Sequence, residues 1–292
     1  MTKILIGCGQ ITWRGVPEEQ ALAEIAQAGY AGAPAGPREG RTARETIDLY
    51  ARYGLRPAPG YYSAEFWRAE QRGQILEQAR RQAAFARELG LTELYVATGG
   101  FTTYLNAAGQ NRKQIAARVG SDDGLSDDQL KRFADTLNEF GALTLREGVR
   151  SCFHNHVGSV IESGAEIERL LALADPAVVF LGPDTGHLAL AGVEPVAFCR
   201  RHLERIKTLH IKDMDAAVLE RGRAAGWDYD TFERNGIFAE LGQGSVDFVA
   251  IFELLRASGF AGWAIAETDT TQLPTALESA TISRAYLRSL HL

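Results

Sequence analysis

Short apolar runs alternate with longer amphipathic runs along the whole chain, and this alternation predicts strands and helices in turn. The apolar runs predicted to be strands are Ile4–Gly7, Tyr30–Ala33, Arg56–Tyr61, Glu93–Ala97, Val149–His154, Val178–Leu181, Ile206–His210 and Trp263–Ala266. The helical patterns between and after them are Glu18–Gln27, Thr42–Tyr53, Arg72–Leu89, Ser126–Leu145, Ser163–Leu173, Glu194–His202, Phe248–Ala257 and Leu273–Leu290. Eight strand-then-helix units without a Gly/Ser/Pro-rich linker predict an α/β fold, a single-domain (β/α)8 TIM barrel over residues 1–292.

The helix boundaries carry their own signals. Capping boxes are predicted where Thr42 precedes Glu45, Ser126 precedes Gln129 and Ser163 precedes Glu166. The rival fold is an open, doubly wound sheet, which would carry G-x-G-x-x-G after its first strand. Gly7 and Gly9 fit that pattern, but Thr12 stands where its third glycine belongs, so the barrel is favoured.

Residues 98–127 interrupt the alternation with a long polar connection after a predicted strand. A connection of this length in a compact domain is usually functional or mobile. Because it follows a barrel strand, we expect it over the carboxyl-terminal mouth, where barrel active sites form. We interpret it as a loop or lid insertion; a decorative insertion is the alternative.

Composition narrows the function classes. The chain has 292 residues, is 46% hydrophobic and has a formal net charge of −6, which argues against a nucleic-acid partner. Cys8, Cys152 and Cys199 are widely spaced, so we expect no disulfide framework and a reducing, cytoplasmic location. No apolar run approaches the roughly 18–20 residues of a membrane span, so no membrane association is expected.

Histidines and acids gather at predicted strand ends. These residues are His154, His156, Asp184, His187, His210 and Glu267. Each has an ordinary explanation alone: Asp184 could cap a helix, and His210 could be a buried core residue. Strand ends of a barrel converge, however, and several carboxylates and imidazoles in one cavity need a compensating positive charge. Mixed ligands of this kind suit Mn²⁺, Co²⁺, Fe²⁺ or Zn²⁺.

Three runs carry a resemblance to a known family. They are Leu181–Leu188 with its Asp-Thr-Gly-His sequence, Leu209–Asp213 and Gly262–Glu267, and His154–Ile161 and Gly226–Phe248 extend the likeness. Together they resemble the xylose-isomerase-like barrel superfamily of sugar isomerases, epimerases and dehydratases, and within it inosose dehydratases. The resemblance spans most of the chain and is firmest from about residue 150 onward.

The resemblance implies a divalent-metal site with Asp184, His210 and Glu267 as ligands. A fourth ligand in such enzymes is usually a Glu, and His154 stands at that place here, with His156 and Glu162 as alternatives. Mn²⁺ or Co²⁺ is expected first, with Zn²⁺, Fe²⁺ and Mg²⁺ as alternatives.

Further roles follow from the same likeness and from the strand-end positions. His156 or Glu267 is the predicted base, and Lys212 or His187 the predicted acid. Contacts to substrate are predicted for His187, Lys212, Glu162 and Trp13. Many relatives carry a Glu after the second strand, but residues 31–37 contain none, so recognition on that side must differ.

These residues predict a metal-dependent lyase that dehydrates a keto-inositol (inosose), or a similar polyhydroxylated ketone, through an enolate. An isomerase or epimerase would use the same groups, and a non-catalytic carbohydrate-binding barrel is a third hypothesis. The related barrel endonucleases need a basic groove, which the net charge of −6 does not favour. A homodimer is a further option, because the aromatic residues Tyr61, Tyr62, Phe66 and Trp67 could serve an interface or the mouth.

Overall fold

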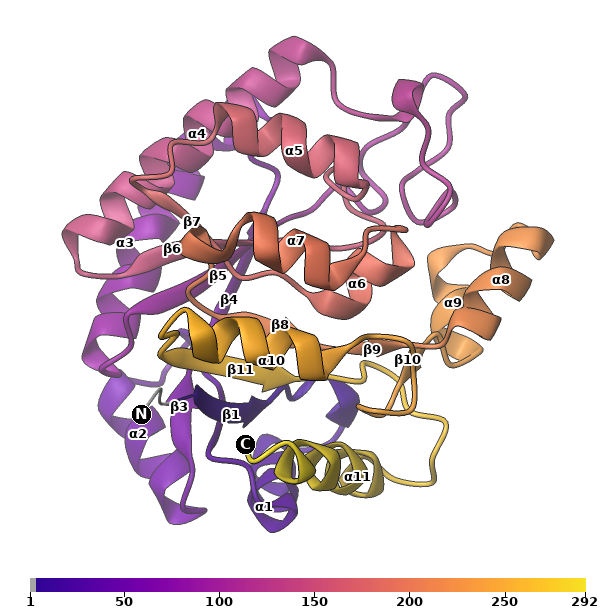
Figure 1. The fold of residues 1–292 in the computed structure, drawn as a ribbon. Coiled ribbons are helices and arrows are strands. Elements are labelled where there is room, and N and C mark those ends of the chain that lie inside the picture. The colour runs from indigo at the N-terminus through magenta and orange to yellow at the C-terminus, as the bar shows by residue number, and fades with distance from the viewer. Residues whose placement is uncertain (1–3) are drawn as a thin grey trace.

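The computed structural model describes residues 4–292, whose parallel strands lie inside a ring of helices (Figure 1). The strands are β1 (Ile4–Cys8), β2 (Gly32–Pro34), β3 (Arg56–Ala58), β4 (Tyr61–Ala64), β5 (Glu93–Thr98), β6 (Arg150–His154), β7 (Val179–Leu181), β8 (Leu209–Ile211) and β11 (Gly262–Ala266). They form two sheets, in the orders β3-β2-β1-β11-β8 and β4-β5-β6-β7. Parallel bridges from Leu181 to Ile206 and from Asp184 to His210 join β7 to the segment of β8. The arrangement is the predicted α/β barrel.

The third predicted strand is divided, and this corrects the expectation of one continuous run over Arg56–Tyr61. β3 pairs with β2 and β4 pairs with β5, and the change of partner falls at Pro59 and Gly60. A proline cannot donate a ladder hydrogen bond. A Cβ on Gly60 would lie 2.4 Å from the carbonyl oxygen of Ala35, so this turn requires glycine.

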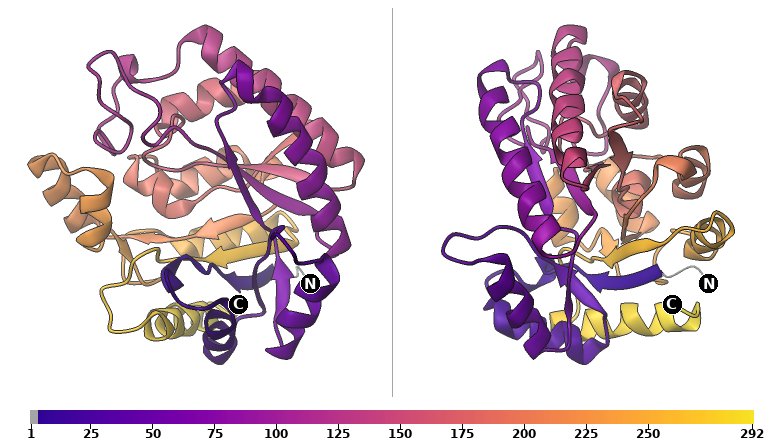
Figure 2. Two further views of the ribbon diagram at one scale, coloured as in Figure 1. Left: turned by 180° about the vertical axis from the view of Figure 1, so that it is seen from behind. Right: turned by 90° about the vertical axis from the view of Figure 1, so that its left-hand side faces the viewer.

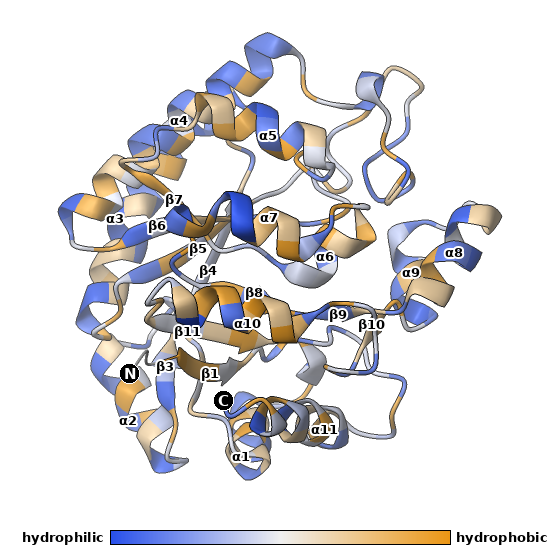
Figure 3. Ribbon diagram, viewed as in Figure 1, coloured by the Kyte–Doolittle hydropathy of each residue, from blue (hydrophilic) through white to orange (hydrophobic). Residues whose placement is uncertain are grey.

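The outer helices correspond closely to the predicted ones. They are α1 (Glu18–Ala28), α2 (Ala43–Arg52), α3 (Arg72–Glu88), α4 (Asp127–Arg146), α5 (Gly164–Leu173), α7 (Pro195–Arg201), α10 (Phe248–Ala257) and α11 (Ala276–Ser289). The three predicted capping boxes are present, at the starts of α2, α4 and α5. Apolar residues concentrate on the strands and on one side of the helices (Figure 3). The main core therefore lies between the sheets and this helical ring.

A smaller cluster fills the barrel itself beneath the carboxyl-terminal mouth. It consists of Ala58, Tyr95, Trp263 and Ile265. The Tyr95 hydroxyl lies 2.6 Å from Thr208 Oγ1, and the Tyr95 ring contacts the His210 ring at a centroid distance of 4.1 Å. The barrel is thus closed below His210, and ligands can reach it only from the mouth.

The alternation did not predict a set of short elements at the mouth. These are α6 (Thr185–Leu190), α8 (Ala216–Ala225), α9 (Tyr229–Arg234) and the antiparallel pair β9 (Asp213–Met214) and β10 (Phe238–Ala239). Short 3-10 helices lie at Ile11–Trp13, Ala69–Gln71, Ser121–Asp123 and Leu203–Arg205. Figure 2 shows α8 and α9 standing off from the barrel.

The loop between β5 and α4 packs against this excursion of β9, α8, α9 and β10. Ala116 and Ala117 of the loop share a buried cluster with Val218, Tyr229 and Phe232. Tyr229 N–H donates to Lys113 O at 2.9 Å, and Arg118 donates to Trp227 O at 3.1 Å. Two segments far apart in sequence therefore support each other beside the mouth. A lid function for residues 98–127 stays a prediction.

Two further expectations concern the chain as a whole. Cys8, Cys152 and Cys199 are buried and unpaired. Among residues 4–292, none of the helices combines the length and the apolar character that a membrane span needs. Phe66 and Trp67 are buried within the chain, which removes them from the aromatic residues available for a dimer interface.

Candidate metal centre and active site

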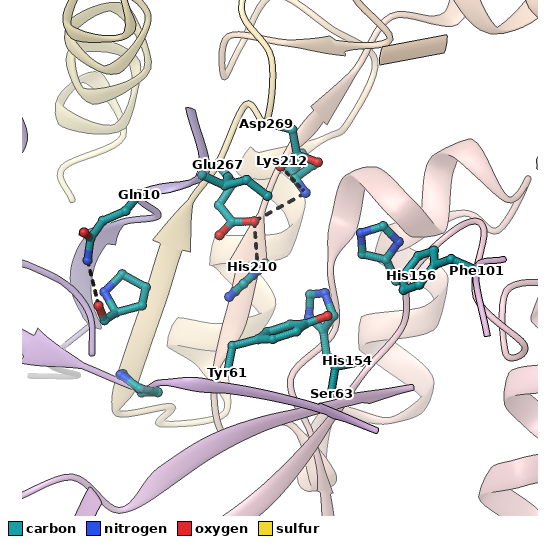
Figure 4. A pocket seen from close by; sticks show the side chains of 13 residues that line it. Gln10, Tyr61, Ser63, Phe101, His154, His156, His210, Lys212, Glu267 and Asp269 are labelled. Atoms are coloured by element: carbon teal, nitrogen blue, oxygen red, sulfur yellow. Dashed lines mark hydrogen bonds and ion pairs between the residues drawn. The ribbon is translucent and has the colours of Figure 1, made fainter. Parts of the chain in front are cut away.

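A cavity of about 360 Å³ opens at the carboxyl-terminal ends of the strands. Polar and aromatic residues from six segments line most of it: Gln10, Tyr61, Ser63, Phe101, His154, His156, His210, Lys212, Glu267 and Asp269. Ile11, Pro34 and Pro59 complete the lining. Figure 4 shows the side chains of Glu267, Lys212 and His210 meeting in its centre.

Four predicted ligands lie close together: three line this cavity, and Asp184 is fully buried next to them. His154 ends β6, Asp184 caps α6, His210 lies in β8 and Glu267 follows β11. Ligand atoms of His154, Asp184 and His210 all lie within 4.8 Å of one another. Glu267 Oε2 lies 3.1 Å from His210 Nδ1, and Asp184 Oδ2 lies 3.8 Å from the same nitrogen. The convergence of strand ends brings the four together, as the barrel prediction required.

Asp184 combines two roles that the sequence left as alternatives. Its Oδ1 accepts the His187 N–H at 2.9 Å, which caps α6. Its Oδ2 faces the cluster, and apart from ion pairing it has no hydrogen-bond partner among residues 4–292. His210 Nδ1, 3.8 Å from this oxygen, and His210 Nε2 are likewise buried and without a hydrogen-bond partner within the same described range. Buried polar atoms without a partner are costly, so their convergence indicates a ligand position.

The hydrogen bonding of His154 leaves one nitrogen available to this cluster. His154 Nδ1 lies 3.2 Å from the carbonyl oxygen of Gly182, which can only accept a hydrogen bond. The proton therefore resides on Nδ1, and the Nε2 lone pair faces Asp184 Oδ2 at 4.0 Å. A carbonyl that fixes the tautomer in this way is a common support for a metal-binding histidine.

Charge gives the strongest test of whether a divalent cation fits. The buried Lys212 ammonium lies 3.2 Å from Asp184, 3.4 Å from Glu267 and 2.9 Å from Asp269. Among these four side chains, three carboxylates against one ammonium leave an excess of two negative charges. Those charges are expensive in a buried site, and a divalent cation would balance them. The donor set of carboxylates and imidazoles therefore fits a divalent metal.

The carboxylates and the ammonium also fix each other's protonation. Burial alone would lower the pKa of Lys212, but Asp184, Asp269 and Glu267 raise it well above its ordinary value. Burial alone would raise the pKa of Glu267, but His210 and Lys212 lower it to about 2. Lys212 is thus protonated and Glu267 ionised over the whole neutral range.

A second group of His156, His187 and Asp269 also brings three ligand atoms within 4.8 Å. Lys212 Nζ lies 3.3 Å from His187 Nε2 and 2.9 Å from Asp269 Oδ1. The ammonium therefore already lies between members of this group, and a cation there would have to displace it. The group of His154, Asp184 and His210 is the better candidate for a metal.

Glu162, a sequence-predicted contact for substrate and an alternative ligand, lies outside the cavity. Its carboxylate accepts the N–H groups of Gly158 at 2.7 Å and Ala117 at 2.6 Å. Ala117 has φ of +60°, a conformation that non-glycine residues rarely adopt. Glu162 therefore holds the loop between β5 and α4 in place. The sequence did not predict these backbone donors, which occupy the carboxylate that was expected to face a ligand.

Trp13 also lies away from the cavity, in contrast to the predicted substrate contact. The 3-10 helix Ile11–Trp13 directs Ile11 into the cavity, whereas Trp13 is buried against the barrel exterior. Its indole N–H donates to Glu24 Oε2 of α1 at 2.6 Å. His187 lies just behind the lining, with its ring against that of His156 at 3.7 Å.

The environment of Glu162 predicts a distinct pH dependence of stability. Burial raises its pKa to about 7, against the opposing effect of Arg112, from an ordinary value of 4.5. The folded state therefore holds a proton between pH 4.5 and 7 that the unfolded state has released, and this contribution to stability is lost as pH rises through 7. Glutamine does not titrate, so the free energy of unfolding of E162Q, compared with that of the wild type, should rise by roughly 2–3 kcal/mol between pH 5 and pH 8. Urea unfolding of both proteins across this range measures the difference, and a pH-independent difference would contradict it.

Several lining residues escaped sequence reasoning. Asp269 lies two residues beyond Glu267 in a bend with φ of +57°, so the alternation of a strand does not predict its place in the cavity. Tyr61, which was expected from sequence at an interface or the mouth, lines the cavity and packs edge-on against His154 at 5.2 Å. Phe101, which was not expected there, packs edge-on against His156 at 5.0 Å. Phe101 comes from the loop after β5, so only the folded chain places it.

Two glycines make room for the charged residues. A Cβ on Gly9 would lie 2.3 Å from Glu267 Oε1, and one on Gly186 would lie 2.7 Å from Lys212 Cγ. Gly186 is the glycine of the Asp-Thr-Gly-His sequence. Its lack of a side chain lets Lys212 extend across α6 toward the three carboxylates.

The fold and the residue pattern together define the protein class. The family model for the xylose isomerase-like TIM barrel matches residues 22–290, so the chain belongs to this family. An inosose dehydratase of Geobacillus thermodenitrificans is 27% identical over 98% of this chain and 97% of its own length. The rhizopine catabolism protein MocC of Rhizobium meliloti is 29% identical over 92% of this chain and 82% of its own length.

Solved structures with the same fold include enzymes of two reaction types. A 3-keto-D-glucoside 4-epimerase from E. coli superimposes with a TM-score of 0.70 at 18% identity, covering 98% of this chain and 100% of the epimerase. The probable 3-DHS dehydratase AsbF from Bacillus anthracis gives a TM-score of 0.70 at 14% identity, covering 99% of each chain. The chain is therefore an enzyme with inosose dehydratases among its relatives, and it shares its fold with an epimerase and a probable dehydratase.

Proposed function

We propose that this enzyme is a metal-dependent dehydratase of a keto-inositol or a closely similar polyhydroxylated ketone. The observation that carries the proposal is the excess of negative charge around Lys212, beside two histidines that each bring a nitrogen within 4.8 Å of the Asp184 carboxylate. The similarity to inosose dehydratases over nearly the whole chain supports the substrate class. A cyclic polyol ketone also suits a cavity of about 360 Å³, near the lower end of the usual range for small-molecule sites.

Asp184, His210, Glu267 and His154 would hold the metal. A divalent ion there, with Mn²⁺ or Co²⁺ expected first and Zn²⁺, Fe²⁺ or Mg²⁺ as alternatives, would act as a Lewis acid toward the substrate carbonyl. The remaining chemistry falls to side chains of the chain itself. In a dehydration, the bond to the α-hydrogen breaks, a C=C bond forms, and the β-hydroxyl leaves as water.

His156 is the proposed base for the α-hydrogen. Its Nδ1 lies 2.6 Å from the carbonyl oxygen of Val157, so Nδ1 carries the proton and Nε2 is free to accept one. Burial, assisted by Lys212, lowers the pKa of His156 to about 3, which keeps the ring neutral at physiological pH. Phe101 and His187 pack against the ring and hold its orientation.

Lys212 is the proposed donor. The protonated Lys212 can hydrogen-bond a substrate oxygen or give a proton to the departing hydroxyl. His187, predicted from sequence as an alternative acid and a substrate contact, is buried behind the lining, with Nε2 3.3 Å from Lys212 Nζ and its ring against His156. We therefore assign His187 a positioning role for Lys212 and His156.

Removing His156 tests the proposed base. H156N should lower kcat by about 10²- to 10⁴-fold, because a positioned base contributes about that much, while metal stoichiometry stays unchanged. The matched control is H202N, since His202 pairs with Glu168 outside the cavity. Unchanged kcat in H156N would shift the role of base to Glu267.

A direct assay tests the proposed function. The protein, freed of metal by chelation and reloaded with Mn²⁺ or Co²⁺, should convert 2-keto-myo-inositol to an unsaturated or dione product with loss of water. Full activity after exhaustive chelation would overturn the metal dependence. Exchange of the α-hydrogen with D₂O without loss of water would indicate an epimerase or isomerase. Failure to retain any metal would favour a non-catalytic binding protein.

A further inference from the structure

One wall of the cavity is apolar. Ile11 and Pro59 come from the segments that follow β1 and β3, and Pro34 is the last residue of β2. In the order of strands around the barrel, this wall lies across from β6 and β7, which carry His154 and Asp184. Figure 4 shows Gln10 at this end of the cavity, well separated from His156 and Phe101, while Tyr61 lies close to His154.

The backbone of this wall offers little to a hydroxyl group. A proline has no N–H, so neither Pro34 nor Pro59 can donate a hydrogen bond. The carbonyl oxygen of Pro34 already accepts from Gln10 Nε2 at 2.9 Å and from the Tyr50 hydroxyl at 2.7 Å. A carbonyl has two lone pairs, and both are therefore committed.

Gln10, the polar neighbour of this wall, has its donor group committed as well. Gln10 Nε2 lies 2.9 Å from Pro34 O and 3.0 Å from the oxygen of the buried Tyr50. Its amide protons are therefore engaged within the protein. The side chains of Ile11, Pro34 and Pro59 present only carbon atoms to the cavity, and the two prolines have no backbone N–H.

A hydroxyl group pressed against these side chains loses hydrogen bonds to water and gains none from them, which is unfavourable. An alkyl group in the same place gains free energy from burial. The side of the cavity with the carboxylates and histidines therefore favours the hydroxyl groups of a polyol, whereas the wall of Ile11, Pro34 and Pro59 favours an apolar substituent.

We infer that the substrate carries an apolar group, a methyl ether or a deoxy carbon, where it faces Ile11, Pro34 and Pro59. This inference rests on the proposed function and specifies its substrate class: a keto-polyol ring with one position lacking a free hydroxyl.

Paired substrates test the inference. For keto-inositols that differ only by one O-methyl group, placed in turn at each ring position remote from the carbonyl, one methyl ether should exceed the parent in kcat/KM by about 10- to 100-fold. The corresponding deoxy ketone should also exceed the parent, which separates loss of the hydroxyl from gain of the methyl group. Titration calorimetry with methylated and unmethylated inositols, which lack the carbonyl, should show the same order of affinity.

Polar substitutions in the wall should reverse the preference. I11N and, separately, P34S add hydrogen-bonding groups at the wall and should bring the parent ketone to parity or better. V249N is the matched control, because Val249 is exposed on α10 and outside the barrel. It should leave the ratio unchanged.

The outcomes separate this inference from the proposed function. If the parent ketone is dehydrated as well as or better than every methyl ether and deoxy form, the inference is wrong and the proposed function stands. If no ketone of the series is dehydrated, the proposed function fails. An unchanged ratio in both I11N and P34S also overturns the inference, since the apolar wall would then not select the substrate.

Discussion

D184N is expected to lose at least about 10³-fold in kcat/KM and to purify with much less divalent metal than the wild type. Asparagine keeps the oxygen that caps α6, so the N–H of His187 stays satisfied. It replaces the buried Oδ2 with an NH₂ group beside Lys212 and His210. The change removes one negative charge and directs donors at the proposed metal. The expected loss of about 10³-fold corresponds to about 4 kcal/mol of transition-state stabilisation.

Metal analysis and steady-state kinetics on the same preparations measure this prediction. D247N is the matched control, because Asp247 caps α10 on the outside of the barrel through the N–H of Ala250. It should keep full metal content and full activity. A D184N protein with wild-type metal content and activity would contradict the assignment of Asp184 as a ligand.

Replacing Lys212 should have the largest effect on stability. K212M leaves Asp184, Asp269 and Glu267 without their common ammonium in a buried site. Removing one partner of a buried charge network costs about 3–5 kcal/mol, and we expect a loss of this size in the metal-free protein. Activity should also fall, since the proposed donor to the substrate is gone.

Divalent metal should partly reverse this instability. In K212M a cation is the remaining positive charge that can balance the carboxylates, so it should raise the free energy of unfolding more than in the wild type. K113M is the control: the ion pair of Lys113 with Asp230 is partly exposed, and its loss should cost about 1 kcal/mol or less. A metal-free K212M as stable as the wild type would show that the carboxylates do not depend on the ammonium.

Much of the fold follows from local pattern. The predicted helix Ser126–Leu145 corresponds to α4, Asp127–Arg146, and its capping box is present. The third strand was predicted as continuous because apolar periodicity does not report a change of hydrogen-bonding partner. That change depends on the close approach of Ala35 to Gly60, which are brought together only by folding.

The elements at the mouth could not be predicted in the same way. α8 and α9 are short, and their buried residues pack on the loop after β5 rather than on the barrel. The spacing of Val218 and Phe232 therefore does not follow the pattern expected for helices that pack on the sheet. Their positions depend on contacts between residues more than a hundred apart in sequence, such as the hydrogen bond from Tyr229 N–H to Lys113 O.

The sequence predicted that Asp184, His210 and Glu267 lie close together, because each is at or next to the end of a strand and a barrel brings strand ends together. Their role as metal ligands stays a prediction. Strand order and side-chain alternation are fixed along the chain, so the sequence by itself determined the barrel and which segments meet at its mouth. Only the tertiary structure decided which side chains enter the cavity: it placed Asp269 beside Lys212, and turned Glu162 toward backbone N–H groups and Trp13 toward α1. Those outcomes depend on distances of a few ångströms between segments remote in sequence, which no local pattern encodes.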